Sequence, residues 1–451
     1  MPTPVIAIFD VGKTNKKIFL FDEDYRIVYE RSARFLETED EDGFPCENLE
    51  NLHLSVLDSI NEILRLKEFK IKAVNFSAYG ASFVYLNEDG EPLTPLYNYL
   101  KPYPENLSKE FYAEYGGEEK ISSDTASPAL GSLNSGLQLY RLKKEQPDIF
   151  RKLKYALHLP QYLSFLVSGQ YYTDITCIGC HTAMWDFANN KYHEWIEREG
   201  VLDKLPPIIP ADQVFPVLNY KVGIGLHDSS AALIPYLVNF KEPFVLISTG
   251  TWCISLNPFD QSVLTADELK KDCLCYLQYD GKPVKASRIF SGAEHEQQVK
   301  RIAEHFKVDV IKFRSMLYDG KLITDLKSRF PQDTNAADFI KGSGFAGRDL
   351  STFKNDTEAY HQLILDLVNQ QSHSTKLVLK GKDTKRIFVD GGFSKNVIYM
   401  HLLAAAFPQI EVYAASMAQA TALGAALAIH SSWNTKPIPH DLIGLKYYSG
   451  S

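Results

Sequence analysis

Two turns rich in glycine and threonine, together with Asp228, which lies between them in the sequence, are the parts of this chain whose residue types could do chemistry. At 5–21, and again at 244–256, an apolar run ends in a polar turn and a second apolar run follows. A short strand that leads into such a turn presents backbone N–H groups and hydroxyls that can hold an anion. Two such hairpins, far apart in one chain, predict two halves that close on one phosphate chain.

Asp228 follows a glycine-punctuated segment at 223–226 and stands where a helix is expected to begin. Its simplest role is a helix N-cap. Its functional role would be a general base, because a carboxylate held between two phosphate-binding hairpins can take a hydroxyl proton as that oxygen attacks a γ-phosphate. The adjacent His227 could hydrogen-bond a sugar hydroxyl, although a packing histidine is the commoner case.

The first turn carries the letters GKT at 12–14, which are the last letters of a P-loop, but the sequence does not fit that motif. A P-loop has a glycine where this chain has Ala7, and it opens a helix, whereas 15–21 has the pattern of a strand. Asp10, at the end of the first apolar run, is either a turn cap or a ligand that binds Mg²⁺ through water.

Length and composition predict a globular protein of two domains, with the boundary near residue 240 (1–240 and 241–451). Hydrophobic residues make up 45% of the chain, the net charge is −8, and basic residues do not cluster, which argues against binding to nucleic acid or an anionic membrane. The N-terminus shows no secretion signal, and apolar runs such as 420–430 are too short to span a bilayer, so we expect a soluble cytoplasmic protein. The six scattered cysteines predict buried free thiols rather than a zinc site.

Helix and strand patterns alternate along both halves. In the first half the pattern predicts a third strand at 26–35, an acidic solvated connection at 37–42 and a helix at 51–66. Two strands follow at 72–93, and a proline-rich connection without regular structure lies at 205–218. In the second half it predicts helices at 291–306 and 357–380, a strand at 387–390, and a last helix at 418–430.

Two helix starts in the second half could face a ligand. The strand at 387–390 leads into Gly391 and Gly392 and then a helix, whose free N–H groups and dipole suit a phosphate or ribose. The last helix consists mostly of small residues and must pack closely, so only its first turn, from Gln419 to Thr421, could face a ligand.

Taken together, five segments in this order resemble the FGGY family of carbohydrate kinases. They are DVGKTNKK at 10–17, GLHDSSAAL at 225–233, STGTW at 248–252, VDGGFSKN at 389–396 and QATALGAAL at 419–427. The resemblance covers essentially the whole chain. It implies an α/β fold of two actin-like (ribonuclease H-like) domains, with ATP, Mg²⁺ and a sugar in the cleft between them.

The resemblance also implies roles for individual residues. Asp228 matches the catalytic base and Asp10 matches the acidic residue near Mg²⁺. The positions that match nucleotide-binding segments are Gly12, Lys13, Thr14 and Lys17 in the first turn, Thr249, Gly250 and Thr251 in the second, Gly391, Gly392 and Asn396 in the adenosine segment, and Gln419 and Thr421 near the nucleotide. Lys13 departs from the family pattern, which has threonine there; it either adds charge to the phosphate site or faces solvent.

The sugar is predicted from fewer residues. The pair His227 and Asp228 is similar to kinases of 6-deoxy ketohexoses, L-rhamnulose and L-fuculose. Tyr79 and Gly80 fit the sugar loop of such kinases, whereas Ser82 stands where an acid is expected. Further candidates for the sugar wall are Tyr79, Trp252 and Trp185 as apolar surfaces and His181 as a polar group. The alternatives are a pentulose (xylulose or ribulose) kinase, a glycerol kinase, or a non-catalytic actin-like nucleotide switch; a homodimer is possible.

Overall fold

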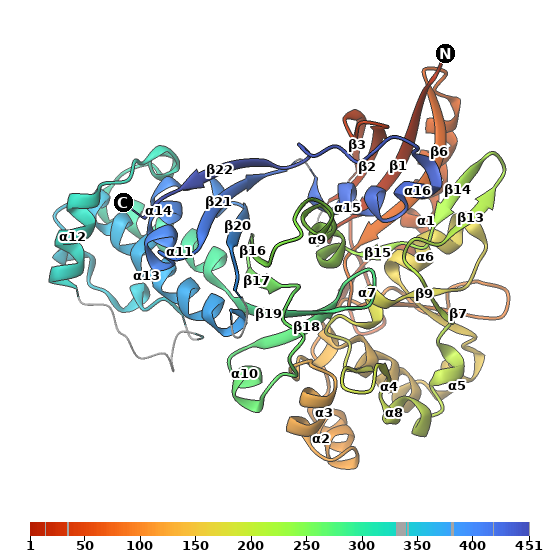
Figure 1. The fold of residues 1–451 in the computed structure, drawn as a ribbon. Coiled ribbons are helices and arrows are strands. Elements are labelled where there is room, and N and C mark those ends of the chain that lie inside the picture. Colours follow the sequence, from red (N-terminus) through yellow and green to blue (C-terminus); the bar gives the residue numbers. More distant parts are fainter. Residues whose placement is uncertain are drawn as a thin grey trace.

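Each of the two lobes is built on a seven-stranded mixed sheet (Figure 1). The computed structural model describes residues 1–13, 15–33, 36–330, 340, 342–379, 383–417 and 419–450. The first sheet contains β1 (Thr3–Val11), β2 (Lys16–Asp22), β3 (Ile27–Ala33), β6 (Phe69–Ala78), β13 (Val214–Val217), β14 (Tyr220–Gly223) and β15 (Leu226–His227). The second contains β16 (Phe244–Thr249), β17 (Cys253–Asn257), β18 (Cys273–Leu277), β19 (Pro283–Ile289), β20 (Arg386–Gly391), β21 (Glu411–Ser416) and β22 (Gly444–Tyr448).

The two sheets repeat one topology. In the first, β1 pairs antiparallel with β2 and parallel with β6; in the second, β16 pairs antiparallel with β17 and parallel with β20. The central strands β1 and β16 are apolar and almost fully buried, as strands covered on both faces must be. The two hairpins predicted from the sequence therefore occupy equivalent places in two related sheets, which confirms the two-domain α/β fold.

Helices cover both faces of each sheet. In the first lobe α1 (Leu49–Arg65) and α6 (Leu159–Ser168) contact β6 on one face, and α9 (Asp228–Asn239), α15 (Ala420–Ala428) and α16 (His430–Trp433) lie on the other. In the second lobe α13 (Asp356–Val378) packs on β17 and β19, with α11 (Ser291–Phe306), α12 (Gly320–Arg329) and α14 (Val397–Ala406) around it. Although α15 and α16 come from the second half of the sequence, they pack on the first sheet; the domain boundary near 240 stays a prediction.

The other helices and the short strands belong mainly to an insertion between β7 and β13 in the first lobe. The helices are α2 (Glu105–Glu114), α3 (Glu118–Asp124), α4 (Ser135–Glu145), α5 (Pro147–Lys152), α7 (Ile175–Ile178), α8 (Glu194–Arg198) and, in the second lobe, α10 (Ala266–Lys270). The strands are β4 (Thr38–Glu39), β5 (Pro45–Cys46), β7 (Phe83–Leu86), β8 (Tyr155–His158), β9 (Thr173–Asp174), β10 (Trp185–Asp186), β11 (Lys191–Tyr192) and β12 (Ile208–Ile209).

Helix α9 lies between the two sheets (Figure 1). Ala231 and Ile234 belong to the core that α15 shares with the first sheet, whereas Leu233 and Tyr236 pack against strands of the second. A side chain at Gly424 of α15 would place its Cβ 1.8 Å from the carbonyl oxygen of Ala231, so only glycine permits this close contact of α15 with α9. The start of α9 is thus fixed from both lobes.

Two predicted connections are in fact structured. The proline-rich segment 205–218 contains β12 and β13, and β13 tolerates Pro216 because it is an edge strand with no neighbour beyond it in the sheet. The acidic segment 37–42 is not simply solvated, since Asp40 is buried and its carboxylate pairs with Lys101 at 2.6 Å. Charge alone could not reveal the buried partner that stabilises this aspartate.

Most predicted helices and strands are confirmed. The helices expected at 51–66, 291–306 and 357–380 appear as α1, α11 and α13 within two residues at each end. The last predicted helix, 418–430, is instead two helices, α15 and α16, and its first residue, Ala418, lies outside the described residues.

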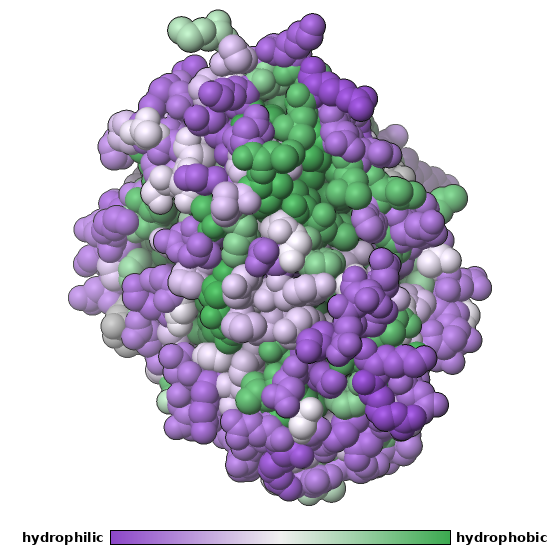
Figure 2. Space-filling view, turned by 90° about the vertical axis from the view of Figure 1, so that its right-hand side faces the viewer, coloured by the Kyte–Doolittle hydropathy of each residue, from purple (hydrophilic) through white to green (hydrophobic). Residues whose placement is uncertain are grey.

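All six cysteines are buried free thiols, as the sequence predicts. No helix in the described part of the chain is both long and apolar enough to cross a lipid bilayer. On the face that belongs to the first lobe, polar side chains surround a band of hydrophobic ones (Figure 2). The homodimer and the lack of nucleic-acid binding stay predictions.

Candidate active site

Asp10 lies at the end of β1 in the first lobe and contacts a helix from the far end of the sequence. The hydroxyl of Thr421, in the first turn of α15, donates a hydrogen bond to Asp10 Oδ2 at 2.8 Å. Burial raises the pKa of Asp10 to about 6; the bond from Thr421 and the charge of Lys17 oppose this rise, while the charge of Asp228 adds to it. The structure therefore brings four predicted residues, Asp10, Lys17, Thr421 and Asp228, to one place.

Asp228 is the first residue of α9, directly after β15. Its Oδ1 accepts a hydrogen bond from the backbone N–H of Ser229 at 2.6 Å, and the ring nitrogen Nε2 of His227 lies 3.4 Å from the same oxygen. The N-cap position belongs to His227, and within the described residues the Asp228 side chain accepts no backbone N–H beyond that of Ser229, so the simple N-cap role is not observed. Its Oδ2 accepts no hydrogen bond from any described residue, and its side chain is 33% exposed.

The predicted sugar loop lies against His227. A Cβ on Gly80 would fall 2.6 Å from Cδ2 of His227, so glycine is required for the imidazole to lie there. His181 and His227 face each other with ring centroids 6.2 Å apart. Burial lowers the pKa of His181 to about 3 and also lowers the pKa of His227. Both rings are therefore neutral at pH 7 and can donate or accept hydrogen bonds.

Tyr79 is buried in this wall rather than open to a ligand through its hydroxyl. Its hydroxyl donates to Glu47 at 3.5 Å, and Glu47 in turn pairs with Lys16 at 2.7 Å. The ring of Tyr79 packs edge-on against Tyr99. Burial raises the pKa of Tyr99, and the charge of Asp228 raises it further, so this tyrosine lies within reach of the Asp228 charge.

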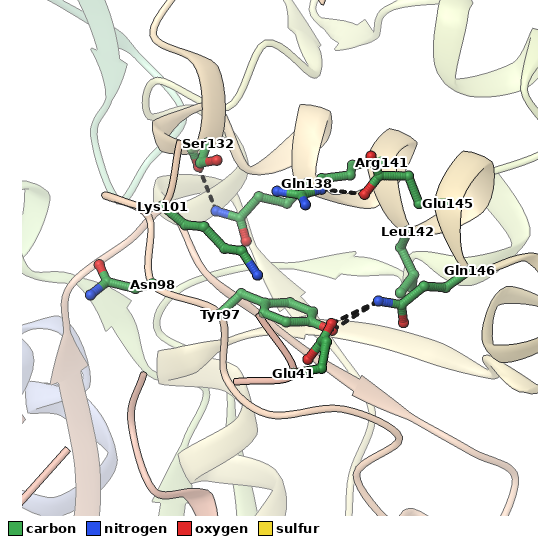
Figure 3. A pocket seen from close by; sticks show the side chains of 10 residues that line it. All are labelled: Glu41, Tyr97, Asn98, Lys101, Ser132, Gln138, Arg141, Leu142, Glu145 and Gln146. Carbon is green, nitrogen blue, oxygen red and sulfur yellow. Dashed lines mark hydrogen bonds and ion pairs between the residues drawn. The ribbon is translucent and has the colours of Figure 1, made fainter. Parts of the chain in front are cut away.

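Gln138 of α4 bonds the predicted sugar loop and also lines a small pocket, which Figure 3 shows. Its Nε2 donates to the carbonyl oxygens of Ala81 at 2.6 Å and Ser132 at 2.5 Å, and Ala81 has a left-handed backbone with φ +63°. Gln138, Lys101 and Tyr97 line a pocket of about 30 Å³ behind the loop, which is room for roughly one or two waters. The buried Oε1 of Gln138 accepts no hydrogen bond from the described residues.

In the second lobe, the backbone of the hairpin turn after β16 packs against the backbone at the end of β20 and at the start of α11. The hydroxyl of Thr249 donates to the carbonyl oxygen of Asp390 at 2.5 Å and accepts from the N–H of Phe393 at 3.0 Å. Gly391 has φ +91°, and a Cβ there would lie 2.0 Å from the Thr249 carbonyl oxygen. A Cβ on Gly292, in the first turn of α11, would lie 1.7 Å from the Gly250 carbonyl oxygen. Thr249 thus holds two turns together, while Gly250 and Thr251 are exposed.

These turns open into a cavity of about 750 Å³. Its lining includes the predicted residues Thr249, Gly250, Thr251, Gly392 and Asn396. Sequence reasoning missed the rest, which come from α11, α13 and the 3₁₀ segments Val310–Ser315 and Phe393–Lys395: Gly292, Ala293, His295, Glu296, Val299, Lys300, Val310, Phe313, Arg314, Tyr360, Phe393 and Lys395. Asn396 caps α14 through its Oδ1 and donates from Nδ2 to the Tyr360 hydroxyl at 2.8 Å.

Several predicted residues have other partners. Lys13 pairs with Glu37 at 2.5 Å and Lys17 pairs with Glu30 at 3.3 Å, although Lys17 also lies opposite Asp10 across the hairpin. The N–H of Gly12 donates to the carbonyl oxygen of Asn15 within the first turn.

Two other predicted residues do not line the cavity of the second lobe, and a third is not described. Thr14 lies outside the described residues. Gln419 precedes α15 with a left-handed φ of +56°, and Trp252 packs on Phe290 with ring centroids 4.7 Å apart. Neither Gln419 nor Trp252 lines the cavity. In the described ranges no three His, Cys, Asp or Glu side chains gather as a metal site, so Asp10 stands alone as the predicted ligand.

Comparison with solved structures defines the class of protein: the fold is that of two-lobed carbohydrate kinases. A carbohydrate kinase from Novosphingobium aromaticivorans superposes with a TM-score of 0.81 at 22% identity over 100% of this chain and 95% of the other. A xylulose kinase from Lactobacillus acidophilus gives 0.77 at 17% identity, over 99% and 94%.

The N-terminal domain of the FGGY family of carbohydrate kinases matches residues 5–228, and the C-terminal domain of carbohydrate kinase FGGY matches 241–437. The chain belongs to this family, whose members are ATP-dependent sugar kinases.

The curated relatives share modest identity with the chain. A rhamnulokinase from Halalkalibacterium halodurans is 25% identical over 54% of this chain and 52% of its own length. An L-fuculokinase from Haemophilus influenzae is 21% identical over 94% and 93%. The match spans about half the length of two rhamnulokinases among the curated relatives.

Proposed function

We propose that this protein transfers the γ-phosphoryl group of ATP to the primary hydroxyl of a ketose, with Asp228 as the general base. The observation that best supports this is the position of Asp228. One oxygen of its carboxylate accepts no hydrogen bond from the described residues, Asp228 begins the helix held between both sheets, and its charge acts on the buried Asp10. A structural N-cap would not need this arrangement.

In the proposed reaction the ketose hydroxyl faces Asp228 Oδ2. The carboxylate accepts the hydroxyl proton as the new oxygen–phosphorus bond forms and the bond from phosphorus to the β-phosphate oxygen breaks, which releases ADP. Neutral His181 and His227 orient the other hydroxyls without adding charge. Closure of the lobes on both substrates excludes water and aligns the reacting atoms.

ATP would occupy the cavity of the second lobe. Phe313 and Tyr360 stack with ring centroids 4.8 Å apart and supply an apolar wall for the adenine ring of ATP. Lys395 and the exposed turn at Gly250 and Thr251 supply a cation, N–H groups and a hydroxyl for the phosphates. The volume of about 750 Å³ is in the range of small-molecule sites.

The residues also fit Mg²⁺. Asp10 offers the hard oxygen ligand that this ion prefers, and a single carboxylate is sufficient when phosphate oxygens and waters complete the shell. Thr421 holds the carboxylate in place. When bound, Mg²⁺ neutralises charge on the phosphates.

For the sugar we propose a 6-deoxy ketohexose, L-rhamnulose or L-fuculose. The His227–Asp228 pair and the similarity to a rhamnulokinase and an L-fuculokinase support this choice. A pentulose or glycerol kinase is the alternative, because xylulose kinases and a glycerol kinase share the fold. A non-catalytic nucleotide switch is the alternative from another class.

The test is ADP release from Mg·ATP with and without L-rhamnulose, L-fuculose, D-xylulose, L-ribulose or glycerol. We expect the highest kcat/KM with one of the two 6-deoxy ketohexoses. A higher value with a pentulose or glycerol would correct the sugar and keep the kinase. ADP release that no member of the panel stimulates would overturn the kinase and favour the switch.

A further inference from the structure

Arg288 of β19 lies on the sheet face that looks toward the first lobe. Its neighbour Ser287 points to the opposite face, where its hydroxyl donates to the Ser374 carbonyl oxygen of α13. Side chains alternate between faces along a strand, so Arg288 shares its face with Ala286 and Val284, which pack in the core beside Tyr276. Tyr276 stacks on the His227 ring, with centroids 5.9 Å apart and planes at 20°. This face of the second lobe therefore borders the base.

Further contacts place Arg288 opposite the proposed sugar wall. The hydroxyl of Ser230, in the first turn of α9, donates to the carbonyl oxygen of Leu277 at 3.0 Å, which joins β18 to the helix that carries Asp228. Burial lowers the pKa of His181, and the nearby charge of Arg288 lowers it further. The charge of Arg288, which belongs to the second lobe, therefore acts on a ring of the first lobe.

The guanidinium is held by two hydrogen bonds, made by Nε and Nη2, and Nη1 takes part in neither. Nε donates to Asp272 Oδ2 at 3.1 Å and Nη2 donates to Asp272 Oδ1 at 2.8 Å. Its plane lies over the ring of Trp252, 5.1 Å from the centroid. Nη1 donates to no residue in the described part of the chain, although Arg288 is only 7% exposed. Because the ion pair with Asp272 and the contact with Trp252 hold the guanidinium in place, Nη1 is a positioned donor that can be offered to a ligand.

We propose that Nη1 of Arg288 donates hydrogen bonds to hydroxyl oxygens of the acceptor sugar, so that the second lobe completes the sugar site and selects neutral sugars over sugar acids. This inference rests on the kinase function proposed above. The choice of a neutral ligand follows from charge. Asp272 already balances the guanidinium, and a second carboxylate would meet both Asp272 and Asp228, whereas a hydroxyl accepts the bond without adding charge.

The arrangement also couples sugar binding to lobe closure. Asp228, His181 and His227 precede residue 240, and Arg288, Tyr276 and Trp252 belong to the second lobe, after residue 240. A sugar that contacts both sets binds best when the lobes are together. Because Trp252 stacks on Arg288 and is the most exposed of the four tryptophans, its fluorescence should respond when a sugar reaches Nη1.

The experiment compares Arg288→Met and Arg288→Lys with Arg386→Met, a control arginine that pairs with Glu242 and Glu411 at the far end of β20. With the best sugar of the panel we expect Arg288→Met to raise the sugar KM about 10- to 100-fold, the value of a lost charged hydrogen bond, and to leave the ATP KM within about twofold. Arg288→Lys should fall between, and Arg386→Met should match the wild type. An unchanged sugar KM, or a rise in the ATP KM alone, would overturn the proposal.

Arg288→Met leaves Asp272 unpaired and could fail to fold, so the double variant Arg288→Met/Asp272→Asn, which removes both charges, is measured beside it. It should melt near the wild-type temperature and keep the raised sugar KM. D-Gluconate tests the selectivity: ADP release that it stimulates better than any neutral sugar would overturn the neutral-sugar part.

Sugar titration without ATP, read by tryptophan fluorescence, separates this proposal from the kinase function. A saturable change that is lost in Trp252→Phe and weakened in Arg288→Met supports the sugar contact even if no turnover occurs. If the panel is turned over but the fluorescence midpoint is the same in Arg288→Met and wild type, the kinase stands and the contact is wrong.

Discussion

The hydroxyl of Thr421 donates a hydrogen bond to Asp10 Oδ2 over 2.8 Å, and the two residues are 411 positions apart in the sequence. The bond joins the first turn of α15 to the end of the first strand, at the point where Asp228 contributes its charge. Because α15 also touches α9 at Gly424, this one helix contacts the elements that carry both carboxylates of the proposed site.

Thr421→Val should shift the pH dependence of turnover. The hydroxyl bond lowers the pKa of Asp10, so its removal raises that pKa above about 6 and more of the carboxyl is protonated near neutral pH. The acid limb of the kcat profile should move to higher pH. Thr421→Ser keeps the hydroxyl and serves as the control; identical acid limbs in the Val variant and the wild type would contradict this role.

Asp10→Asn should stabilise the fold while it reduces activity. The folded-state pKa of Asp10 is raised from 3.8 to about 6, so the folded protein binds more protons than the unfolded chain between these values, and stability falls as the pH rises through this window. Above pH 6 the penalty is at most about 3 kcal/mol, which asparagine avoids. Urea unfolding at pH 4 and pH 7 should show a gain for the variant at pH 7 and little difference at pH 4. An equal effect at both pH values would show that ionisation of Asp10 is not the cause.

The sequence predicts the residues of this region that belong to local motifs and misses those that only the fold brings there. Asp10, Asp228 and Thr421 each lie where a strand meets a turn or a helix begins, and such ends carry readable signals. Arg288 and Tyr276 lie within strands whose patterns indicate only burial, and their approach to His227 depends on how the second sheet meets α7 and α9. The sequence alone does not decide whether Lys13 adds charge to the phosphate site or faces solvent. Its pairing with Glu37 depends on a neighbouring segment that the hairpin pattern does not reveal.

Thr249→Val should weaken nucleotide binding. The hydroxyl links the Asp390 carbonyl to the Phe393 N–H, and valine leaves both backbone groups without this partner in a largely buried position. We expect a loss of about 1–3 kcal/mol of stability and a raised ATP KM, with the sugar KM little changed. Thr249→Ser retains both bonds and should behave as wild type. A raised sugar KM with a normal ATP KM would contradict the role of this turn.

Gln138→Leu should affect the sugar rather than the nucleotide. Gln138 donates a hydrogen bond to the carbonyl oxygen of Ala81, whose left-handed backbone follows Gly80, the glycine that lies against His227. Without the amide, we expect a raised sugar KM, an unchanged ATP KM and a loss of about 1–3 kcal/mol of stability. Gln146→Leu, at the rim of the same pocket, removes an amide that does not reach the loop and is the matched control. Equal sugar KM values for the two variants would rule out support of the loop.

Asp228→Asn tests the base itself. Its Oδ1 bonds only to the neighbouring Ser229 and lies near His227, so an amide of the same shape should leave the start of α9 in place. The amide cannot accept the proton, and turnover should fall by roughly two to four orders of magnitude, with melting temperature and nucleotide affinity close to wild type. Asp267→Asn, in the first turn of the exposed helix α10, is the control for loss of an acidic residue at a helix start. Near-normal turnover in Asp228→Asn would show that this residue is not the base. Asp10, the other carboxylate of the site, would then be tested as the base through Asp10→Asn.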